Sequence, residues 1–331
     1  MIFLISQHNS DHTTNDVSDW LWHKKASYRR INGVDAYDAI DYPVDIQSKE
    51  VAGYRGLHHQ IIGGKKVIWF RRWLPPEYYY TLGAFSDKEN LNRQMTDYLK
   101  QEGAELRNYF MHLFVRSADS VLTDFTKAGV NKIYILELAE SLGMTIPTTI
   151  ITGSKKTLQT FMKNTGEVIV KNIKDAGFFE HQEKFYVSFT ALVRPEDVEQ
   201  APDNFFPSLF QQAIQKSYEI RVFYLDGTCY AMAIFSQASA KTSVDFRNYD
   251  YRKPSRNVPY NLPEELQQKV DKLMKSAGLN CGSLDFIRSS TGEYVFLEIN
   301  PVGQFGFVSE PCNYYLEEKV ADWLIAKEIK E

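Results

Sequence analysis

The feature that most constrains the fold is a pair of strand-like segments near the end of the sequence, residues 281–288 (CGSLDFIR) and 293–301 (EYVFLEINP). The four residues between them, SSTG, are polar or small and end in glycine, which is typical of a tight turn. Two apolar-rich runs joined by so short a turn predict an antiparallel β-hairpin. Because side chains alternate between the two faces of a strand, Leu297 and Ile299 are expected to point into a core.

The opposite face of this hairpin gathers oxygen-bearing side chains. Glu298 and Asn300 lie two residues apart and therefore share a face. A turn centred on Ser290-Thr291 pairs Asp285 near Phe296, which places the Asp285 carboxylate on that same face. The sequence thus predicts two carboxylates and one amide oxygen in a single cluster.

Two carboxylates held this close repel each other unless a cation offsets their charge. Mg²⁺ takes oxygen ligands and is commonly bound by one or two carboxylates together with substrate phosphates. A cluster without His or Cys therefore points to Mg²⁺ and a nucleotide. Two alternatives stay open at this point. One is a solvated hairpin face without a ligand, and the other is a glycosidase pair of carboxylates, for which the sequence offers no sugar-binding signal.

The chain of 331 residues is long enough for about two to three domains, each with its own core. Lys and Arg number 38 against 42 Asp and Glu, and the net charge is −4. This balance argues against nucleic acid as the main partner. The three cysteines, Cys229, Cys281 and Cys312, form no CxxC pair, so neither a disulfide framework nor a thiolate zinc site is predicted. These counts favour a reducing, cytoplasmic location.

The N-terminal segment favours the same location. The apolar run Met1–Ile5 is too short for a secretory signal, has no basic residue before it and continues into polar residues. It predicts a first buried strand. No later stretch approaches the roughly 18 apolar residues that span a bilayer, so no membrane partner is expected.

Periodicity and turn residues along the chain predict three parts, an N-terminal α/β domain over 1–125, a central domain over 126–205 and a C-terminal domain over 206–331. Strands and helices alternate in the first part, which is typical of an open α/β sheet. The predicted elements are a strand at 67–70, a helix opened by the capping box at 86–89, a helix over 131–143, a strand over 167–171, a strand pattern over 185–193, a connection marked by Pro202, Asn204 and Pro207, a hairpin turning at Asp226-Gly227, and a helix after Pro263 that ends at Gly278.

Charged side chains accompany these elements. Lys132 begins the helix over 131–143, and Lys171 ends an apolar strand, from which a long cationic side chain reaches a phosphate. Either lysine alone is equally well explained as a solubilising charge. Glu219 and Arg221 alternate with apolar residues and share one face of a strand. Arg221 is therefore a candidate phosphoryl clamp, and the alternative is a surface ion pair with Glu219.

The order of these residues resembles the ATP-grasp superfamily over roughly the last two thirds of the chain. The matching features are helix-start Lys132, strand-end Lys171, the segment 208–214 (SLFQQAI), Glu219-x-Arg221, Asp285 and Glu298-x-Asn300. The resemblance implies an α/β (α+β) ATP-grasp fold of three subdomains, with the nucleotide held between two antiparallel sheets. It also implies that the two lysines hold ATP phosphates and that the strand with Gln211, Gln212 and Ile214 faces adenine. Asp285, Glu298 and Asn300 would then ligate two Mg²⁺ ions.

Further segments narrow the resemblance to the graspetide synthetases, which are peptide-cyclising ATP-grasp ligases of the microviridin and grasp-with-spasm types. These segments are 300–305 (NPVGQF), Arg71-Arg72 after 67–70, 244–247 (VDFR), 2–6 (IFLIS) and 16–20 (DVSDW). Ligases that add glutamate to a ribosomal protein carry a glycine-rich loop after the second lysine. That loop is absent, because residues 171–177 (KNIKDAG) hold a single glycine.

Within this resemblance, Arg221 and Arg247 are the candidate catalytic residues. Arg221 would offset charge on the phosphoryl group, and Arg247 would grip the acceptor carboxylate or the transferred phosphoryl group. Gln212 stands where many relatives have an acidic residue, so adenine would meet either its side chain or its backbone. Glu219 is the residue that would approach the ribose.

The resemblance implies an enzyme that uses ATP to phosphorylate Asp or Glu side chains of a ribosomal precursor peptide. It would then join them to Ser or Thr hydroxyls or Lys amines, forming macrocyclic ω-ester or ω-amide links. The expected partners are the leader and core of that peptide, and a homodimer is compatible with the resemblance. Three rival functions stay open, which are a ligase that adds an amino acid to a protein or small molecule, a non-catalytic nucleotide-binding regulator, and a module that only binds peptide.

Overall fold

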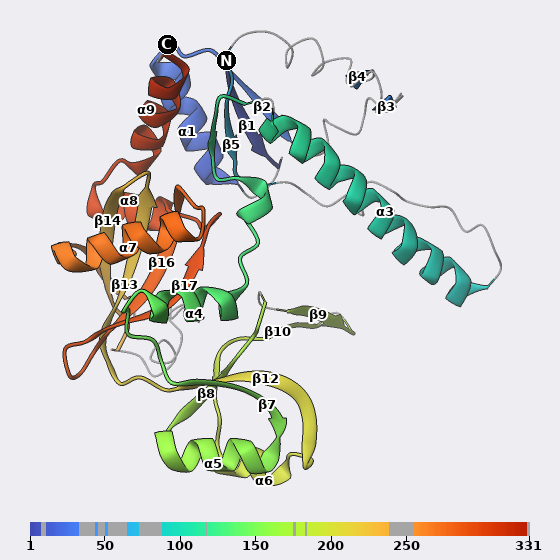
Figure 1. Cartoon of the computed structure of the whole chain (residues 1–331), viewed down its shortest axis with the longest axis vertical. Coiled ribbons are helices and arrows are strands. Elements are labelled where there is room, and N and C mark those ends of the chain that lie inside the picture. Colours follow the sequence, from blue (N-terminus) through green and yellow to red (C-terminus); the bar gives the residue numbers. More distant parts are fainter. Residues whose placement is uncertain are drawn as a thin grey trace. The chain divides into compact units, whose positions relative to one another are not determined.

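The computed structural model describes residues 1–7, 11–32, 44–45, 50–51, 65–72, 88–116, 118–174, 177–182, 184–237 and 255–329 (Figure 1). They form two compact units. Unit 1 comprises residues 1–129, 304–309 and 315–331, and unit 2 comprises 130–303 and 310–314. Each unit has its own sheet or sheets and its own core.

Unit 1 is built on a sheet of four parallel strands in the order β2-β1-β5-β6. Its strands are β1 Ile2–Ser6, β2 Tyr28–Asn32, β5 Val67–Phe70 and β6 Ser120–Leu122, and a separate ladder joins β3 Val44–Asp45 to β4 Glu50–Val51. Its helices are α1 His12–His23, α3 Glu89–Arg116, the 3-10 helix η2 Phe125–Lys127 and α9 Leu316–Ile329. The predicted open α/β sheet and its two predicted strands are confirmed. Of the predicted capping box, residues 86–87 lie outside the described residues, and the helix itself begins at Glu89.

The core of unit 1 explains why β1 is apolar throughout. All five residues of β1 are buried, as in strands that are covered on both faces. One face packs in a cluster of Phe3, Ile5, Ile31, Ile68 and Met111, the last from α3.

Unit 2 contains two antiparallel sheets. The first, of four strands, has the order β11-β8-β12-β7, and the second, of five strands, has the order β15-β14-β13-β16-β17. The strands of the first are β7 Thr149–Ser154, β8 Val168–Lys171, β11 Ala191–Leu192 and β12 Asn204–Gln212, and a separate hairpin joins β9 Phe178–His181 to β10 Lys184–Val187. Those of the second are β13 Lys216–Leu225, β14 Thr228–Phe235, β15 Arg256–Tyr260, β16 Cys281–Ser289 and β17 Tyr294–Asn300.

The remaining helices are α4 Lys132–Ser141, α5 Lys155–Thr165, α6 Pro195–Gln200, α7 Glu264–Ser276 and α8 Gly306–Cys312. The helices predicted over 131–143 and after Pro263 are confirmed as α4 and α7. Asn131 caps α4, because its side chain accepts hydrogen bonds from the backbone N–H groups of Ile133 (3.0 Å) and Tyr134 (3.2 Å). The predicted hairpin at Asp226-Gly227 is also confirmed, with both turn residues at positive φ.

Two expectations for the first sheet of unit 2 are wrong. The alternating pattern over 185–193 forms no single strand, because β10 ends at Val187 and pairs only with β9, whereas β11 begins at Ala191 and pairs with β8. Asn204 and Pro207 mark no connection and instead lie in β12, where the register with β7 shifts between Asn204 and Ser208. A proline fits there because the irregularity removes the need for a ladder hydrogen bond.

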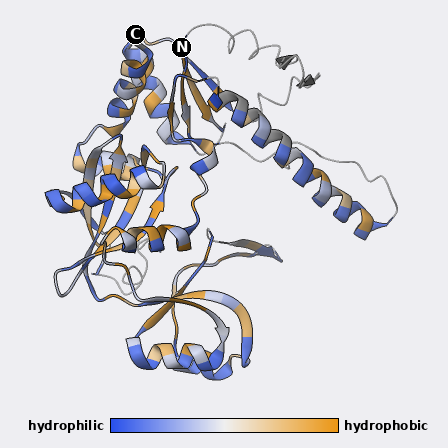
Figure 2. Ribbon diagram, viewed as in Figure 1, coloured by the Kyte–Doolittle hydropathy of each residue, from blue (hydrophilic) through white to orange (hydrophobic). Residues whose placement is uncertain are grey.

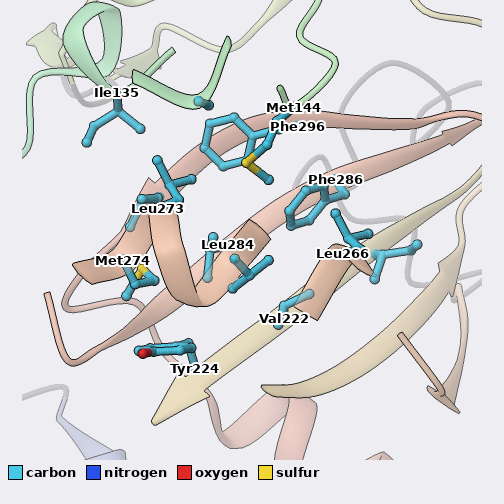
Figure 3. Close-up of a cluster of buried hydrophobic side chains, with 14 of the residues drawn as sticks. Ile135, Met144, Val222, Tyr224, Leu266, Leu273, Met274, Leu284, Phe286 and Phe296 are labelled. Carbon is cyan, nitrogen blue, oxygen red and sulfur yellow. The ribbon is translucent and has the colours of Figure 1, made fainter. Parts of the chain in front are cut away.

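The larger core cluster of unit 2 lies on one face of the five-stranded sheet (Figure 3). Helix α7 contributes Leu266, Leu273 and Met274 to it, and α4 contributes Ile135. Figure 2 shows most of the visible surface of α7 as hydrophilic, as expected of a helix that buries one stripe and exposes the rest. The opposite face of the sheet is therefore left for polar side chains.

The hairpin β16–β17 forms as predicted, but its register differs from the prediction. Asp285 pairs with Glu298 and not with Phe296, because a β-bulge follows Asp285 and the next pair is Phe286 with Phe296. The bulge leaves Leu297 half-buried, and this side chain lines a cavity, so its expected place in the core is wrong. Ile299 is buried in the core, as predicted.

No helix in the described part of the chain is both long enough and apolar enough to span a bilayer.

Candidate functional site

A cavity of about 70 Å³ lies within unit 2, between residues of its two antiparallel sheets. Seven of the eleven predicted site residues line it, namely Lys171, Gln211, Gln212, Ile214, Glu219, Asp285 and Glu298. A second cavity of about 220 Å³ shares Ile169, Ile214 and Ile287 with the first, so the two adjoin. A concave site with few polar groups on apolar walls is the usual form of a small-molecule site.

The wall that the four-stranded sheet provides is set by strand alternation. Phe210 and Val170 pair across β12 and β8 and pack beneath α5, so their neighbours Gln211 and Lys171 belong to the other face. Gln211 is almost fully buried. Its Nε2 donates to Thr149 Oγ1 (3.0 Å), but its buried Oε1 accepts no hydrogen bond within the described ranges. A buried acceptor without a donor is unfavourable, so this oxygen is suited to a ligand that brings an N–H group.

The side chain of Gln212 makes a longer hydrogen bond than that of Gln211. Its side-chain oxygen accepts from Thr148 Oγ1 at 3.4 Å, and its backbone N–H donates to Thr148 O at 2.9 Å. The following residue, Ala213, donates its N–H to Glu167 O at 2.8 Å. These bonds fix the end of β12 where the chain passes from the four-stranded to the five-stranded sheet.

Glu219 is a buried carboxyl on the wall from β13. Lys216 Nζ lies 2.5 Å from its Oε1, and Ser236 Oγ donates to its Oε2 at 2.6 Å. Burial raises the pKa of Glu219, and the Asp285 carboxylate raises it further, while Lys216 and the two hydrogen bonds act in the opposite direction. Glu219 is therefore tied to Lys216, and the alternative of a surface pair between Glu219 and Arg221 is wrong.

Arg221 pairs instead with Asp285, which faces it from β16. Arg221 Nη1 donates to Asp285 Oδ2 at 2.5 Å, and both side chains are largely buried. Breaking a buried pair of this kind leaves an uncompensated charge, so the two side chains hold each other in place. As predicted, Arg221 shares a face with Glu219, and Ile220 and Val222 point the opposite way into the core.

Glu298 has a cationic partner of its own. Lys132 Nζ lies 3.3 Å from Glu298 Oε2 and also donates to Lys174 O at 2.9 Å. Lys132 occupies the first position of α4, and α4 packs against β17, which explains how a helix-start residue reaches the hairpin. The cavity edge thus combines two carboxylates that face each other in the ladder with a cation beside each.

Asn300 completes the predicted cluster. It lies two residues beyond Glu298, opposite Ser283, and its side chain is exposed. Across the described residues, no group of three or more His, Cys, Asp or Glu side chains forms a complete metal cage. Two facing carboxylates and an amide oxygen nevertheless fit Mg²⁺, because this ion is commonly held by one or two carboxylates and takes its other ligands from phosphates and water.

Ten of the eleven predicted site residues fall in the described part of unit 2, and Arg247 lies outside the described residues. Sequence reasoning missed three contributors to the site, which are Lys216, Ser236 and Gly303. Lys216 stands three residues before Glu219, and this spacing of opposite charges was the available signal. Ser236 carries no such signal, and Gly303 lies in the segment 300–305 that carries the resemblance, but only the fold shows that it meets Arg221.

The sequence matches no protein-family model and no curated protein. Three-dimensional comparison finds solved structures that are similar over nearly the whole chain. A RiPP-associated ATP-grasp ligase from Chryseobacterium gregarium, solved with ADP and a leader and core peptide, is 21% identical, with a TM-score of 0.77 over 98% of this chain and 96% of that chain. The macrocyclase MdnC from Microcystis aeruginosa, bound with precursor peptide MdnA, is 22% identical, with a TM-score of 0.75 over 98% and 99%.

A third structure, the ATP-grasp ligase PsnB complexed with a phosphomimetic variant of minimal precursor, Mg and ADP, is 17% identical, with a TM-score of 0.76 over 99% of this chain and 98% of that chain. Likeness of this extent establishes the fold. The predicted ATP-grasp fold is therefore confirmed, including the two antiparallel sheets that border the cavity.

Proposed function

We propose that this protein is an ATP-dependent peptide ligase that cyclises a ribosomal precursor peptide. It phosphorylates an Asp or Glu side chain and joins it to a Ser or Thr hydroxyl or a Lys amine of the same peptide. The observation that carries the proposal is the cavity between two sheets, where the facing pair Asp285–Glu298 is bordered by Arg221 and Lys132. The similar structures support it, since they were solved with ADP, with Mg and with precursor, leader or core peptides.

The proposed nucleotide contacts follow from the walls of the cavity. Lys132 and Lys171 bind phosphates, and the end of β12, with Gln211, Gln212 and Ile214, binds adenine. Gln211 Oε1, which accepts no hydrogen bond from the described residues, supports this assignment, because adenine carries an amino group that can donate to it. Glu219 is proposed to lie near the ribose. Its carboxylate is bonded to Lys216, and the lone pairs that this bond does not use would make the contact with the ribose.

Asp285, Glu298 and Asn300 are proposed to hold two Mg²⁺ ions, which when bound would offset the charge of the ATP phosphates. The protein groups act around them. Arg221, held by Asp285, stabilises charge on the transferred phosphoryl group, and Arg247 is proposed to grip the acceptor carboxylate or that phosphoryl group. The carboxylate oxygen attacks the γ-phosphorus and ADP leaves. The hydroxyl or amine then attacks the acyl carbon, and phosphate departs with the carboxylate oxygen while the nucleophile loses its proton.

The division into parts at residues 125 and 206 stays a proposal, although β12 runs across the second position. The central part would close over the site and exclude water from the acyl phosphate. A cytoplasmic location and a homodimer also stay predictions. A cytoplasmic enzyme would have ATP and a newly made peptide within reach.

The experiment is to incubate the protein with Mg²⁺, ATP and the short peptide encoded beside its gene, and to weigh the peptide. Cyclisation removes one water for each bond formed, whereas addition of an amino acid increases the mass. ATP binding with unchanged peptide mass and no ADP release would point to a regulator. Asp285→Asn should abolish the mass loss, and the exposed Asp203→Asn is the matched control that should retain it.

A further inference from the structure

Arg72 follows the carboxyl end of β5 in unit 1, and its side chain has no partner among the residues that the structure describes. The side chain is half-buried and its Nε is fully buried, yet neither a hydrogen bond nor an ion pair joins it to any residue within the described ranges. Its backbone is fixed, because its N–H donates to Ile5 O (3.1 Å) on the neighbouring strand β1. A buried donor without an acceptor is unfavourable. A ligand that accepts hydrogen bonds from the Arg72 guanidinium would explain why this buried donor is present.

The place of Arg72 in the sheet is where open parallel sheets bind ligands. In the order β2-β1-β5-β6, the chain leaves β1 toward one edge of the sheet and leaves β5 toward the other. Crossovers between parallel strands are right-handed in nearly all proteins, so connections that leave β1 and β5 toward opposite edges of the sheet make the boundary between these two strands a topological switch point. Ligands of such sheets bind at this switch point, outside the carboxyl ends of the strands.

The neighbouring Arg71 has a partner, so it differs from Arg72. Arg71 is buried, and its Nε lies 3.8 Å from Asp11 Oδ1. Asp11 is positioned in turn by two hydroxyls, since its Oδ2 accepts from Ser6 Oγ (2.5 Å) and Thr14 Oγ1 (2.6 Å). Asp11, the carboxylate that the described residues place at this switch point, is therefore committed to Arg71.

A third guanidinium, that of Arg30 on β2, binds neutral oxygens. It donates to Asn32 Oδ1 (2.9 Å), to Gln7 O (2.8 Å) and to Ser6 Oγ (3.2 Å). Arg30 on β2 and Arg71 and Arg72 after β5 are thus three guanidiniums on or directly after the two strands that flank β1, and among the described residues Asp11 is the carboxylate paired with one of them. The positive charge of Arg72 favours an anionic ligand.

We propose that Arg72 is the binding group of a carboxylate site at this switch point, which receives a carboxylate of the peptide substrate. A guanidinium suits a carboxylate because its planar fork matches the two oxygens. The proposal rests on the proposed function for its substrate, but the site itself is defined by unit 1 alone. Carboxylate chemistry admits two sources, an acidic side chain and a peptide C-terminus.

The test measures ligand binding to the full-length protein by saturation-transfer NMR with three small probes. N-acetylglutamate α-amide carries only a side-chain carboxylate, N-acetylglutamine carries only an α-carboxylate, and N-acetylglutamine α-amide carries neither. We expect one or both carboxylate probes to bind wild type, and the one that binds identifies the source. Arg72→Gln should weaken that binding by about tenfold or more, as for loss of a charge-assisted bond.

Two further variants control the measurement. Arg72→Lys keeps the charge without the fork and should recover only part of the binding, and equal melting temperatures should verify that both variants fold. Arg93→Gln removes an exposed guanidinium on α3 that bonds neutral Asn90, and it should leave binding unchanged. The proposal is overturned if the neutral probe binds equally well, if neither carboxylate probe binds wild type, or if binding survives in Arg72→Gln.

Mg·ATP binding in the same samples separates this proposal from the proposed function. Loss of Arg72-dependent carboxylate binding with intact Mg·ATP binding would reject the carboxylate site alone. Absence of Mg·ATP binding with an intact carboxylate response would reject the proposed function alone.

Discussion

Gly303 lies where any side chain would meet the guanidinium of Arg221. A Cβ built on Gly303 would be 2.8 Å from Arg221 Nη2, 3.1 Å from Asn300 O and 3.1 Å from Ser283 Cβ. The backbone at Asn300 and the Cβ of Ser283 cannot easily move, so the Arg221 guanidinium would have to shift. That shift would disturb its ion pair with Asp285, in which Arg221 Nη1 lies 2.5 Å from Asp285 Oδ2. The absence of a side chain at Gly303 thus sets the position of Arg221.

Gly303→Ala should therefore impair catalysis more than stability. We expect kcat for peptide-dependent ADP release to fall by roughly 10- to 100-fold, which is the scale on which small misplacements of a positioned group act. Nucleotide affinity should change much less. The control is Gly129→Ala, since a Cβ at Gly129 would meet nothing within 4 Å. Unchanged kcat in Gly303→Ala would show that Arg221 does not act on the reacting groups.

Because the pKa of Glu219 is raised, the direction in which pH changes the free energy of unfolding can be predicted. Burial favours the protonated carboxyl, so around and above the ordinary pKa of 4.5 the folded state binds more protons than the unfolded state. The contribution of this group to stability is then greatest at low pH and declines as pH rises. The free energy of unfolding is measured in urea for wild type and Glu219→Gln at pH 4.5, 5.5 and 7. The value for wild type minus the value for the variant should fall as pH rises.

The same pH series on Glu140→Gln, an exposed position of α4, should show a smaller change. If wild type gained stability relative to Glu219→Gln as pH rose, the pKa of Glu219 would be lowered and the burial argument would be wrong.

At the scale of elements, the hairpin β16–β17 shows what alternation predicts and what it misses. The grouping of Asp285, Glu298 and Asn300 on one side followed from the sequence, because Glu298 and Asn300 lie two residues apart on one strand and Asp285 lies on its partner. The pairing did not follow, because the bulge after Asp285 leaves no signature in residue types. Arg288 pairs with Tyr294, so the turn is centred on Thr291 and the register is already one residue away from the prediction before the bulge adds a second. A shift of two residues preserves the face. The bulge also moved Leu297 from the core to the cavity wall.

The failed strand over 185–193 has a similar cause. Its apolar residues alternate as a half-buried strand requires, yet Phe185 is 75% exposed on the isolated hairpin β9–β10. Alternation reports only which residues share a side. It does not report whether another layer covers that side, since this depends on distant segments.

The hairpin also anchors the core beneath the site. Phe296 is fully buried, and its ring packs edge-on against Phe286 with centroids 5.5 Å apart. Phe296→Ala should lower the free energy of unfolding by about 3–5 kcal/mol, as expected for a large cavity in a packed core. Phe206→Ala is the matched control, because Phe206 is 83% exposed, and its effect should stay within about 0.5 kcal/mol. Similar urea midpoints for the two variants would contradict this assignment of the core.

At the scale of the whole molecule, the motif order predicted the ATP-grasp fold although no family model or curated protein matches. The order suffices because lysines, carboxylates and the Asn follow one another in a fixed sequence of strands and helices. Sequence could not reveal that residues 304–309 and 315–331 return to unit 1, since that depends on packing of α9 against α1, β1 and β5. It also could not reveal the ion pairs Lys132–Glu298 and Arg221–Asp285, whose members lie far apart in the chain.

The proposed nucleotide site can be tested without the peptide. Lys171 lies at the end of β8 on the cavity wall, and Lys171→Ala should weaken ATP binding by about tenfold or more because a charged contact to phosphate is lost. Isothermal titration calorimetry with Mg·ATP gives the dissociation constant. Lys156→Ala, at an exposed position of α5, is the control and should bind as wild type does. Equal affinities for wild type and Lys171→Ala would remove Lys171 from the phosphate site.

The central claim is that ATP activates a carboxylate of the peptide, and oxygen tracing tests it most directly. The peptide encoded beside the gene is prepared with ¹⁸O in its Asp and Glu side chains and incubated with the protein, Mg²⁺ and unlabelled ATP. We expect each bond formed to release one phosphate carrying one ¹⁸O, because the carboxylate oxygen leaves with the phosphoryl group. Bond formation with unlabelled phosphate would contradict it.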